Sequence, residues 1–189
     1  MATNTETELV LKAKQDCTAF ILLYRAYLPR VYQYVFFRVK NREEAEDITS
    51  TVWEKVLTHL PTFNPAHEHS FPAWLFRIAH NQLTDFYRKN SNNRAPLPLE
   101  SQTETADPQP HPLETIMNRN RAQSIKKLVD RLPPQQAQTI ELRFFAELKN
   151  HEIARLQGIS EKTVASNLCR GLRTLQQLWT ASGDAVKRS

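Results

Sequence analysis

The first 157 residues of this 189-residue chain contain no glycine, and only Gly158, Gly171 and Gly183 follow. P-loops, the dinucleotide-binding fingerprint of Rossmann domains and many two-residue β-hairpin turns all depend on glycine. These architectures are therefore excluded from most of the chain. The chain also has eleven prolines and few alternating apolar runs, which favours helices that proline interrupts. We expect an all-α protein.

The N-terminal residues lack the features of an export signal. Residues 1–8 are polar and acidic, whereas a signal peptide begins with basic residues and continues into an apolar core. The sequence has no run of about 18 apolar residues, the length that a membrane-spanning helix needs. Cys17 and Cys169 stand alone without a CxxC motif, and we expect small buried side chains rather than a disulfide. We predict a soluble, cytoplasmic protein without membrane insertion.

A proline-rich segment separates two parts of the chain. Residues 91–113 contain five of the eleven prolines and no aromatic residue, so they cannot bury enough apolar surface to offset the entropy of ordering. We expect a flexible linker there, between helical domains at residues 1–90 and 114–182, with a tail at 183–189. The net charges of residues 1–90, 91–113 and 114–189 are +1, −2 and +6. A basic C-terminal part is typical of nucleic-acid binding, although exposed helices are often basic for solubility alone.

The first domain contains a helix with clear start and stop signals. Asn41 and Glu44 form a capping-box pattern, and apolar residues follow at helical spacing until Pro61. The acidic residues of its first turn also complement the helix dipole, so they have a purely structural explanation as well.

The next helix, expected to begin with Ser70 as its N-cap, carries a polar stripe on one face. The stripe has spacings of four, three and four residues, and it consists of Arg77, Asn81, Thr84 and Arg88. This combination suits single-stranded nucleic acid, because cations bind phosphates, polar side chains bind base edges and nearby aromatic rings stack on bases. A solvated face of an ordinary bundle helix would have the same spacing, so the pattern leaves both interpretations open.

The second domain contains a helix-turn-helix pattern. A short helix at residues 150–156 is followed by a turn with Gly158, and Ser160 is a good N-cap for a helix to about Trp179. We expect one stripe of this helix to face the core, formed by Val164, Leu168, Leu172, Leu175 and Trp179. The opposite, basic side would enter the DNA major groove, with its first turns at bases and its arginines at phosphates. These candidate residues are Ser160, Glu161, Lys162, Thr163, Ser166, Arg170 and Arg173; the alternative is a plain α-hairpin with a basic flank.

The sequence offers no convincing metal or catalytic site. His67 and His69 are two residues apart, so they cannot share a helical face, and neither an HExxH motif nor a nearby cysteine accompanies them or His80. No Ser-His-Asp or paired-carboxylate arrangement stands out. We therefore predict no metal, no cofactor, no small-molecule substrate and no enzymatic activity.

Three segments together resemble a known family. Residues 45–56, 71–89 and 132–175, in this order and with a linker before the last, are similar to bacterial RNA polymerase sigma factors of the sigma-70 family. The small size resembles the extracytoplasmic-function (ECF, group IV) subclass. The resemblance implies a factor without a catalytic site that gives core RNA polymerase its promoter specificity. It also implies a region 2 helical bundle and a region 4 helix-turn-helix domain.

The resemblance further implies roles for individual residues. The helix at 41–60 would dock on the clamp helices of the largest polymerase subunit, best matched by Glu46, Asp47, Ile48 and Trp53. Ser50 and Thr51 stand where relatives often have a Gln-Glu pair. The helix at 71–89 and the loop before it would open and read the −10 promoter element, with Asn81 beside an extruded base. The residues implied at that element are Phe63, Trp74, Arg77, Asn81, Thr84 and Arg88.

The helix-turn-helix domain would read the −35 element, although Ala165 and Cys169 depart from the family's usual residues there. The implied partners are core RNA polymerase, promoter DNA and an anti-sigma factor. Two other classes remain: a stand-alone helix-turn-helix regulator, and an interaction protein such as an adaptor. The first leaves the aromatic, acidic first domain without a role, and the second does not need two DNA-facing stripes.

Overall fold

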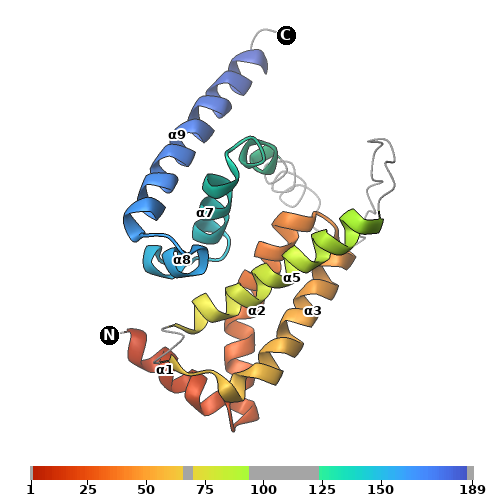
Figure 1. Cartoon of the computed structure of the whole chain (residues 1–189), viewed down its shortest axis with the longest axis vertical. Helices are drawn as coiled ribbons and strands as arrows, with labels where there is room; N and C mark the ends of the chain where they lie inside the picture. Colours follow the sequence, from red (N-terminus) through yellow and green to blue (C-terminus); the bar gives the residue numbers. More distant parts are fainter. Residues whose placement is uncertain (1, 66–69, 94–123, 187–189) are drawn as a thin grey trace.

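The protein is all-α, as the missing glycines predict. A computed structural model describes residues 2–65, 70–93 and 124–186 (Figure 1), and within these ranges all regular secondary structure is helical. Most of the predicted linker lies outside the described residues, as do His67 and His69. Among the described helices, none combines the length and the apolar character that a membrane crossing requires.

The N-terminal half is a bundle in which the long helix α2 packs against its neighbours on several sides. Its elements are α1 (Ala2–Ala13), α2 (Cys17–Val39), α3 (Arg42–His59), the short 3-10 helix η1 (Leu60–Thr62) and α5 (Phe71–Asn93). Helix α5 thus continues past residue 90, where we expected the first domain to end. The described part of the C-terminal half contains helical residues 124–129 and the helices α7 (Pro134–Phe144), α8 (Asn150–Gln157) and α9 (Glu161–Val186).

The predicted N-caps are confirmed, because each supplies a side-chain oxygen to an otherwise unpaired backbone N–H of the first turn. The Asn41 side chain accepts from the Glu44 N–H at 3.2 Å. The hydroxyl of Ser70 accepts from the Ala73 N–H at 3.2 Å. At the start of α9, the Ser160 hydroxyl accepts from the Thr163 N–H at 3.1 Å.

Large aromatic side chains fill the core of the N-terminal half. Tyr34 and Phe76 are fully buried and meet edge to face, with ring centroids 5.5 Å apart. A second cluster joins α2 to the start of α5 with centroid separations of 5.1 to 5.9 Å; it comprises Tyr27, Phe63, Phe71 and Trp74. Burial of each such ring contributes roughly 1.5–3 kcal/mol, so this packing fixes where α5 begins.

The two halves are not separate bodies, because one continuous apolar core runs through both. The rings of Phe37 on α2 and Phe145 after α7 are stacked with centroids 3.8 Å apart. Helix α8 also packs beside α5 (Figure 1). The sequence pattern predicts two domains on a tether and contains no signal for this contact.

Among the described residues, two other than glycine adopt the left-handed backbone conformation, and both lie where the halves meet. Lys40 caps the C-terminus of α2 with φ 60°, and Glu147 lies between α7 and α8 with φ 53°. Each forms an ion pair with the other half, Lys40 with Asp130 and Glu147 with Arg30, at 3.4 Å in both cases. The two residues that turn the chain at the end of a helix therefore also attach one half to the other.

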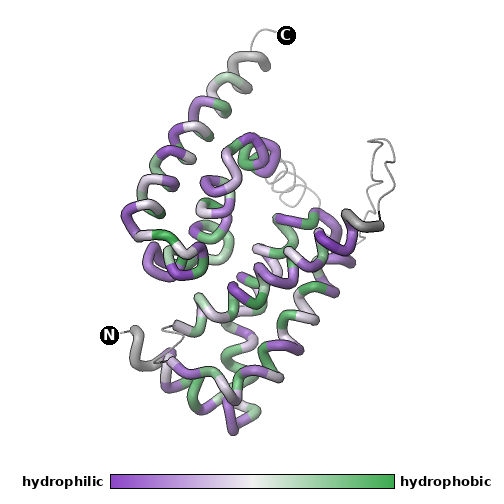
Figure 2. Tube along the Cα trace, viewed as in Figure 1, coloured by the Kyte–Doolittle hydropathy of each residue, from purple (hydrophilic) through white to green (hydrophobic). Residues whose placement is uncertain are grey.

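Two expectations about buried residues are wrong. Cys17 and Cys169 are both exposed and unpaired rather than buried, because each lies on a helix face that no other described helix covers. Leu172 and Trp179 are 44% and 53% exposed, whereas Val164 is buried and Leu168 packs against the core. Apolar and polar residues keep alternating along α9 (Figure 2), but α9 extends beyond the helices that could cover this stripe (Figure 1).

The turn between α8 and α9 yields a stability prediction. Gly158 caps α8 with φ 67°, and a Cβ at this position would meet nothing within 4 Å, so a substitution acts through the backbone alone. We expect Gly158→Ala to lower the free energy of unfolding by about 1 kcal/mol, measured by urea denaturation. Gly158→Asn is the matched control and should lose less, because asparagine tolerates the left-handed region better. Equal stability of Gly158→Ala and the parent protein would contradict this account.

Candidate nucleic-acid and protein-docking surfaces

The polar stripe predicted on α5 is a real surface feature. Arg77, Asn81, Thr84 and Arg88 are all exposed, because the apolar side chains between them pack against α2 and α3. The Thr84 hydroxyl donates to the His80 carbonyl at 3.0 Å, and Arg88 pairs with Asp85 at 3.1 Å. Amide, hydroxyl and guanidinium groups therefore alternate along one accessible face, which suits contacts with phosphates and base edges.

The two aromatic residues assigned to the same site lie in the core. Phe63 and Trp74 are 3% and 7% exposed, with ring centroids 5.1 Å apart. In this structure Phe63 packs against the first turn of α5, to which Trp74 belongs, and both rings are buried away from solvent. Their direct contact with DNA stays a prediction.

The N-terminal part of α9 presents the candidate recognition face. Glu161, Lys162 and Thr163 are exposed in its first turn, and Arg170 and Arg173 are exposed further along. The face is held in place by Val164, which is fully buried, and by the left-handed turn at Gly158. A helix fixed in this way can enter a major groove about 12 Å wide with its first turn at the base edges.

Two members of the recognition face differ from the rest, Ser160 in its role and Ser166 in its exposure. The hydroxyl of Ser160 caps α9 and lies 2.8 Å from the Thr163 hydroxyl, so its first role here is structural. Ser166 is half-buried. The exposed cations and Glu161 therefore form most of the surface that DNA would meet.

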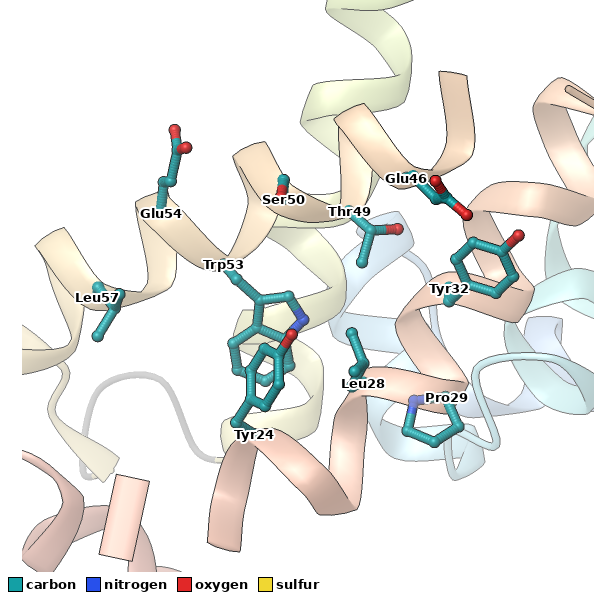
Figure 3. Close-up of a pocket in the computed structure, with 10 residues that line it drawn as sticks. All are labelled: Tyr24, Leu28, Pro29, Tyr32, Glu46, Thr49, Ser50, Trp53, Glu54 and Leu57. Carbon is teal, nitrogen blue, oxygen red and sulfur yellow. The ribbon is translucent and has the colours of Figure 1, made fainter. Parts of the chain in front are cut away.

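A groove between α2 and α3 is the clearest concave surface near a predicted docking residue. Its volume is about 600 Å³, and Figure 3 shows side chains from both helices converging on it. The rings of Tyr24 and Trp53 form its floor with centroids 4.7 Å apart. The residues that line this docking groove are Tyr24, Leu28, Pro29, Tyr32, Glu46, Thr49, Ser50, Trp53, Glu54 and Leu57.

Only some of the predicted docking residues reach this groove. Glu46 and Trp53 line it, whereas Ile48 is buried in the core beneath. Asp47 is exposed on α3 outside the lining. Sequence reasoning missed the α2 wall, because the pairing of α2 with α3 decides which aromatic residues face the groove. The aromatic residues of α2 at helical spacing were the one sequence signal that could have indicated this wall.

The chemistry of the docking groove indicates what it can bind. Its floor is apolar and aromatic, while Glu46 and Glu54 place carboxylates along the α3 side. Leu57 at one end is 54% exposed, an apolar side chain that water surrounds unless a partner covers it. The groove therefore suits a protein segment with apolar side chains flanked by basic ones.

Within the part of the chain that the structure describes, no three His, Cys, Asp or Glu side chains are grouped as a metal site would require. His80 is half-buried between the halves, with Nδ1 3.4 Å from the Tyr34 hydroxyl and 3.4 Å from the Gln138 amide nitrogen. Burial, followed by the positive charge of Arg38, lowers the pKa of His80. A neutral imidazole here acts as a hydrogen-bonding group in the contact between the halves.

Comparisons with known families match both halves of the chain. Sigma-70 region 2 matches residues 23–93, and Sigma-70, region 4 matches residues 122–175. The ECF RNA polymerase sigma factor BldN of Streptomyces coelicolor is 31% identical over 90% of this chain, which spans 64% of that relative's length. The ECF RNA polymerase sigma factor SigX of Bacillus subtilis is 29% identical over 84% of this chain and 82% of SigX.

Two solved structures share the fold at low sequence identity. One is CnrH in complex with the cytosolic domain of CnrY, with a TM-score of 0.70, 20% identity and coverage of 93% of this chain and 97% of the other. The other is the sigma factor RpoE in complex with the anti-sigma factor NepR from Bartonella quintana. Its TM-score is 0.62 at 21% identity, covering 85% of this chain and 96% of that one.

The recognition face yields a binding prediction. We expect Arg170→Ala to weaken binding to duplex DNA several-fold regardless of sequence, because it removes a phosphate contact. The slope of log affinity against log salt concentration should fall by about one, measured by fluorescence anisotropy across a salt series. Lys12→Ala, which removes an exposed cation from α1, is the control and should change neither quantity. A slope unchanged in Arg170→Ala would remove Arg170 from the interface.

Proposed function

The chain belongs to the sigma-70 family, in its extracytoplasmic-function subclass, and on this premise we propose that it directs core RNA polymerase to promoters. It is a regulatory subunit rather than an enzyme, as its relatives are. The observation that carries the proposal is the presence, in one chain, of two exposed polar helix faces and one apolar docking groove on separate surfaces. Each surface has the chemistry of a different step of initiation.

The first step is docking on polymerase. The docking groove supplies apolar contacts along Tyr24, Trp53 and Leu57, while the carboxylates of Glu46 and Glu54 attract basic side chains of the partner. In this proposal the partner is the pair of clamp helices of the largest polymerase subunit. Asp47, exposed beside the groove, adds to the negative potential that steers the approach.

The second step is reading the −35 element. The first turn of α9 enters the major groove, where Glu161 can accept from a cytosine amino group and Lys162 can donate to guanine. Arg170 and Arg173 follow at phosphates, where they fix register without reading sequence. Thr163 and Ser166 complete the face toward the bases.

The third step is capture of unpaired −10 bases by the stripe on α5. Extruding a base costs a few kcal/mol, which contacts in the site must offset. Asn81 supplies amide donors and an acceptor for a base edge, while Arg77 and Arg88 contact phosphates. The buried Phe63 and Trp74 hold this part of α5 rigid, which keeps the stripe in place during melting.

We also propose that the protein works in the cytoplasm and that an anti-sigma factor restrains it. The restraint by an anti-sigma factor is supported by the structure of RpoE, which was solved in complex with the anti-sigma factor NepR. A stand-alone helix-turn-helix regulator is the alternative. It would explain α8 and α9 but would leave the docking groove without a partner.

One reconstitution separates these functions. Core polymerase, this protein and a promoter library are combined, and the transcripts are sequenced from their 5′ ends. A sigma factor yields transcripts that start at a fixed distance from a shared pair of elements and that vanish without the protein. Duplex binding without such transcripts would favour the stand-alone regulator.

The α5 stripe yields a prediction about promoter opening. We expect Asn81→Ala to reduce the fraction of open complexes at least several-fold, because a flipped base loses its hydrogen-bonding partner. Permanganate reactivity of unpaired thymines measures this, and the affinity for core polymerase should stay unchanged. Gln177→Ala, an exposed amide on the distal part of α9, is the matched control. Loss of polymerase binding by Asn81→Ala would show that the assigned role is wrong.

The docking groove yields a prediction about polymerase binding. We expect Leu57→Asp to weaken the affinity for core polymerase at least ten-fold, because it places a charge where the apolar contact forms. Leu11→Asp is the matched control, since Leu11 is 46% exposed on α1 outside the groove. Both variants should keep the parental helix content by circular dichroism. Equal affinities of the two variants for polymerase would mean that the groove is not the docking site.

A further inference from the structure

We infer that the N-terminal helix α1 positions the start of α5 for −10 recognition, because polar groups of α1 and of the turn after it hold both ends of the connection from η1 to α5. Lys14, just after α1, holds the chain at Phe63, where η1 ends. Glu6, on α1, holds the beginning of α5 through Tyr27. We call these two contacts the α1 brace. The inference rests on the proposed function, since it concerns how the first turns of α5 are kept in place for DNA.

The DNA-facing stripes and the docking groove all lie outside α1. The Sigma-70 region 2 match begins at residue 23, so α1 and the start of α2 precede it. Even so, α1 is firmly packed: Val10 and Ala13 are buried in the apolar core, and Leu9 packs against it. The helix lies at the end of the bundle where η1 ends and α5 begins (Figure 1). Such a helix has a definite place from which it can act on α5.

The first contact of the brace is a hydrogen bond from Lys14 to the main chain of Phe63. The Lys14 ammonium group donates to the Phe63 carbonyl, across 49 positions of the sequence. Phe63 caps η1, and its own N–H donates to the Leu60 carbonyl at 3.1 Å. A hydrogen bond from a charged donor is stronger than one between neutral groups. Because the acceptor belongs to the backbone, Lys14 fixes the path of the chain at this point.

The turn that carries Lys14 is itself held by hydrogen bonds. The backbone N–H groups of Gln15 and Asp16 both donate to the Lys12 carbonyl at 3.0 Å. The Asp16 side chain accepts from the Thr18 N–H at 2.8 Å and caps α2. The half-buried Lys14 side chain therefore reaches η1 from a fixed base.

The second contact of the brace runs from Glu6 through Tyr27 to Phe71. The Tyr27 hydroxyl donates to Glu6 Oε1, and the Tyr27 ring meets the Phe71 ring edge to face with centroids 5.3 Å apart. Tyr27 is 5% exposed, so its hydroxyl would be costly to leave without a partner. Phe71 is the first residue of α5. Helix α1 thus acts on the beginning of α5 through one intervening ring.

Both contacts end in the same aromatic cluster. The Phe63 ring centroid lies 5.9 Å from that of Phe71 and 5.1 Å from that of Trp74, and all three rings are buried. A close-packed interior transmits a displacement rather than absorbing it, so a shift of Phe63 or Phe71 would move Trp74. Arg77, the first residue of the polar stripe, follows Trp74 by three positions and is exposed. The brace therefore sets the direction of the turns with which the stripe begins.

The chemistry of the two contacts favours a role in geometry over a role in stability. Burial of Val10 and Ala13 already attaches α1 to the bundle. An internal hydrogen bond adds little net free energy, because it replaces a hydrogen bond to water, but it is directional. Two directional bonds that fix the two ends of one connection constrain where the next helix begins.

Matched variants remove each contact while they keep a long side chain at the position. Lys14→Met removes the ammonium donor, and Lys12→Met is its control, since Lys12 is an exposed lysine two positions away. Glu6→Met removes the acceptor of the Tyr27 hydroxyl, whereas Glu6→Gln keeps an oxygen that can accept. Circular dichroism establishes that all four variants are folded.

Hydrogen–deuterium exchange tests the brace without polymerase or DNA. We expect Lys14→Met and Glu6→Met to speed the exchange of amides at residues 73–77 at least three-fold, with the amides of α9 unchanged. Lys12→Met and Glu6→Gln should exchange at the parental rate. Exchange that rises equally in all helices would show general destabilisation only. That result, or parental exchange at the start of α5 in both methionine variants of the brace, would overturn the inference.

Transcription with reconstituted holoenzyme tests the consequence for DNA. The measured quantity is the ratio of transcripts from a promoter to those from copies with one altered base in the −10 or the −35 element. We expect Lys14→Met and Glu6→Met to lower the −10 ratio at least five-fold, while the −35 ratio and the affinity for core polymerase stay unchanged. Glu6→Gln should keep the parental −10 ratio. A purely structural role would lower all transcripts together and preserve both ratios, and this outcome would overturn the inference.

The two measurements separate the brace from the proposed function. If the parent protein yields no promoter-specific transcripts, the proposed function fails, and the exchange comparison still decides whether α1 holds the start of α5. If the parent protein directs transcription and the −10 ratio does not respond to either methionine variant of the brace, the positioning role is wrong and the proposed function stands.

Discussion

Burial of α2 on several sides is the packing that the rest of the molecule depends on. A helix that is apolar nearly all round is stable only when neighbours surround it, and α2 meets α1, α3 and α5 along its length. Tyr27 and Tyr34 hold the first two turns of α5 through ring contacts with Phe71 and Phe76. The exposed polar stripe of α5, the docking groove and the contact with the C-terminal half all take their positions from this one helix.

The contact between the halves differs from the core in its balance of forces. Inside the bundle, the contacts are mainly between aromatic rings and apolar side chains. At Arg38 and Glu141, a charge pair is buried together with stacked rings, and such a pair contributes more to the choice of register than to net stability.

Local signals predicted the local structure well. The caps at Asn41, Ser70 and Ser160, the turn at Gly158 and the exposure of Asn81 all follow from residues within a few positions. Features that depend on which helices pack against each other could not be predicted from the sequence. Arg38 and Glu141 are over a hundred residues apart, the α2 wall of the docking groove depends on how α2 and α3 pair, and the exposure of Leu172 and Trp179 depends on where α7 stops covering α9.

The scarcity of glycine has a cost that appears at Lys40 and Glu147. Glycine would adopt their left-handed conformation freely, whereas a side chain raises the energy of each by roughly 1–2 kcal/mol. In return, the same two side chains make ion pairs that cross between the halves. A glycine at either position would relax the turn and at the same moment delete a contact between the halves. At these two positions, an unstrained backbone and an ion pair between the halves therefore exclude each other. The chain has the strained residue, and with it the ion pair, at both.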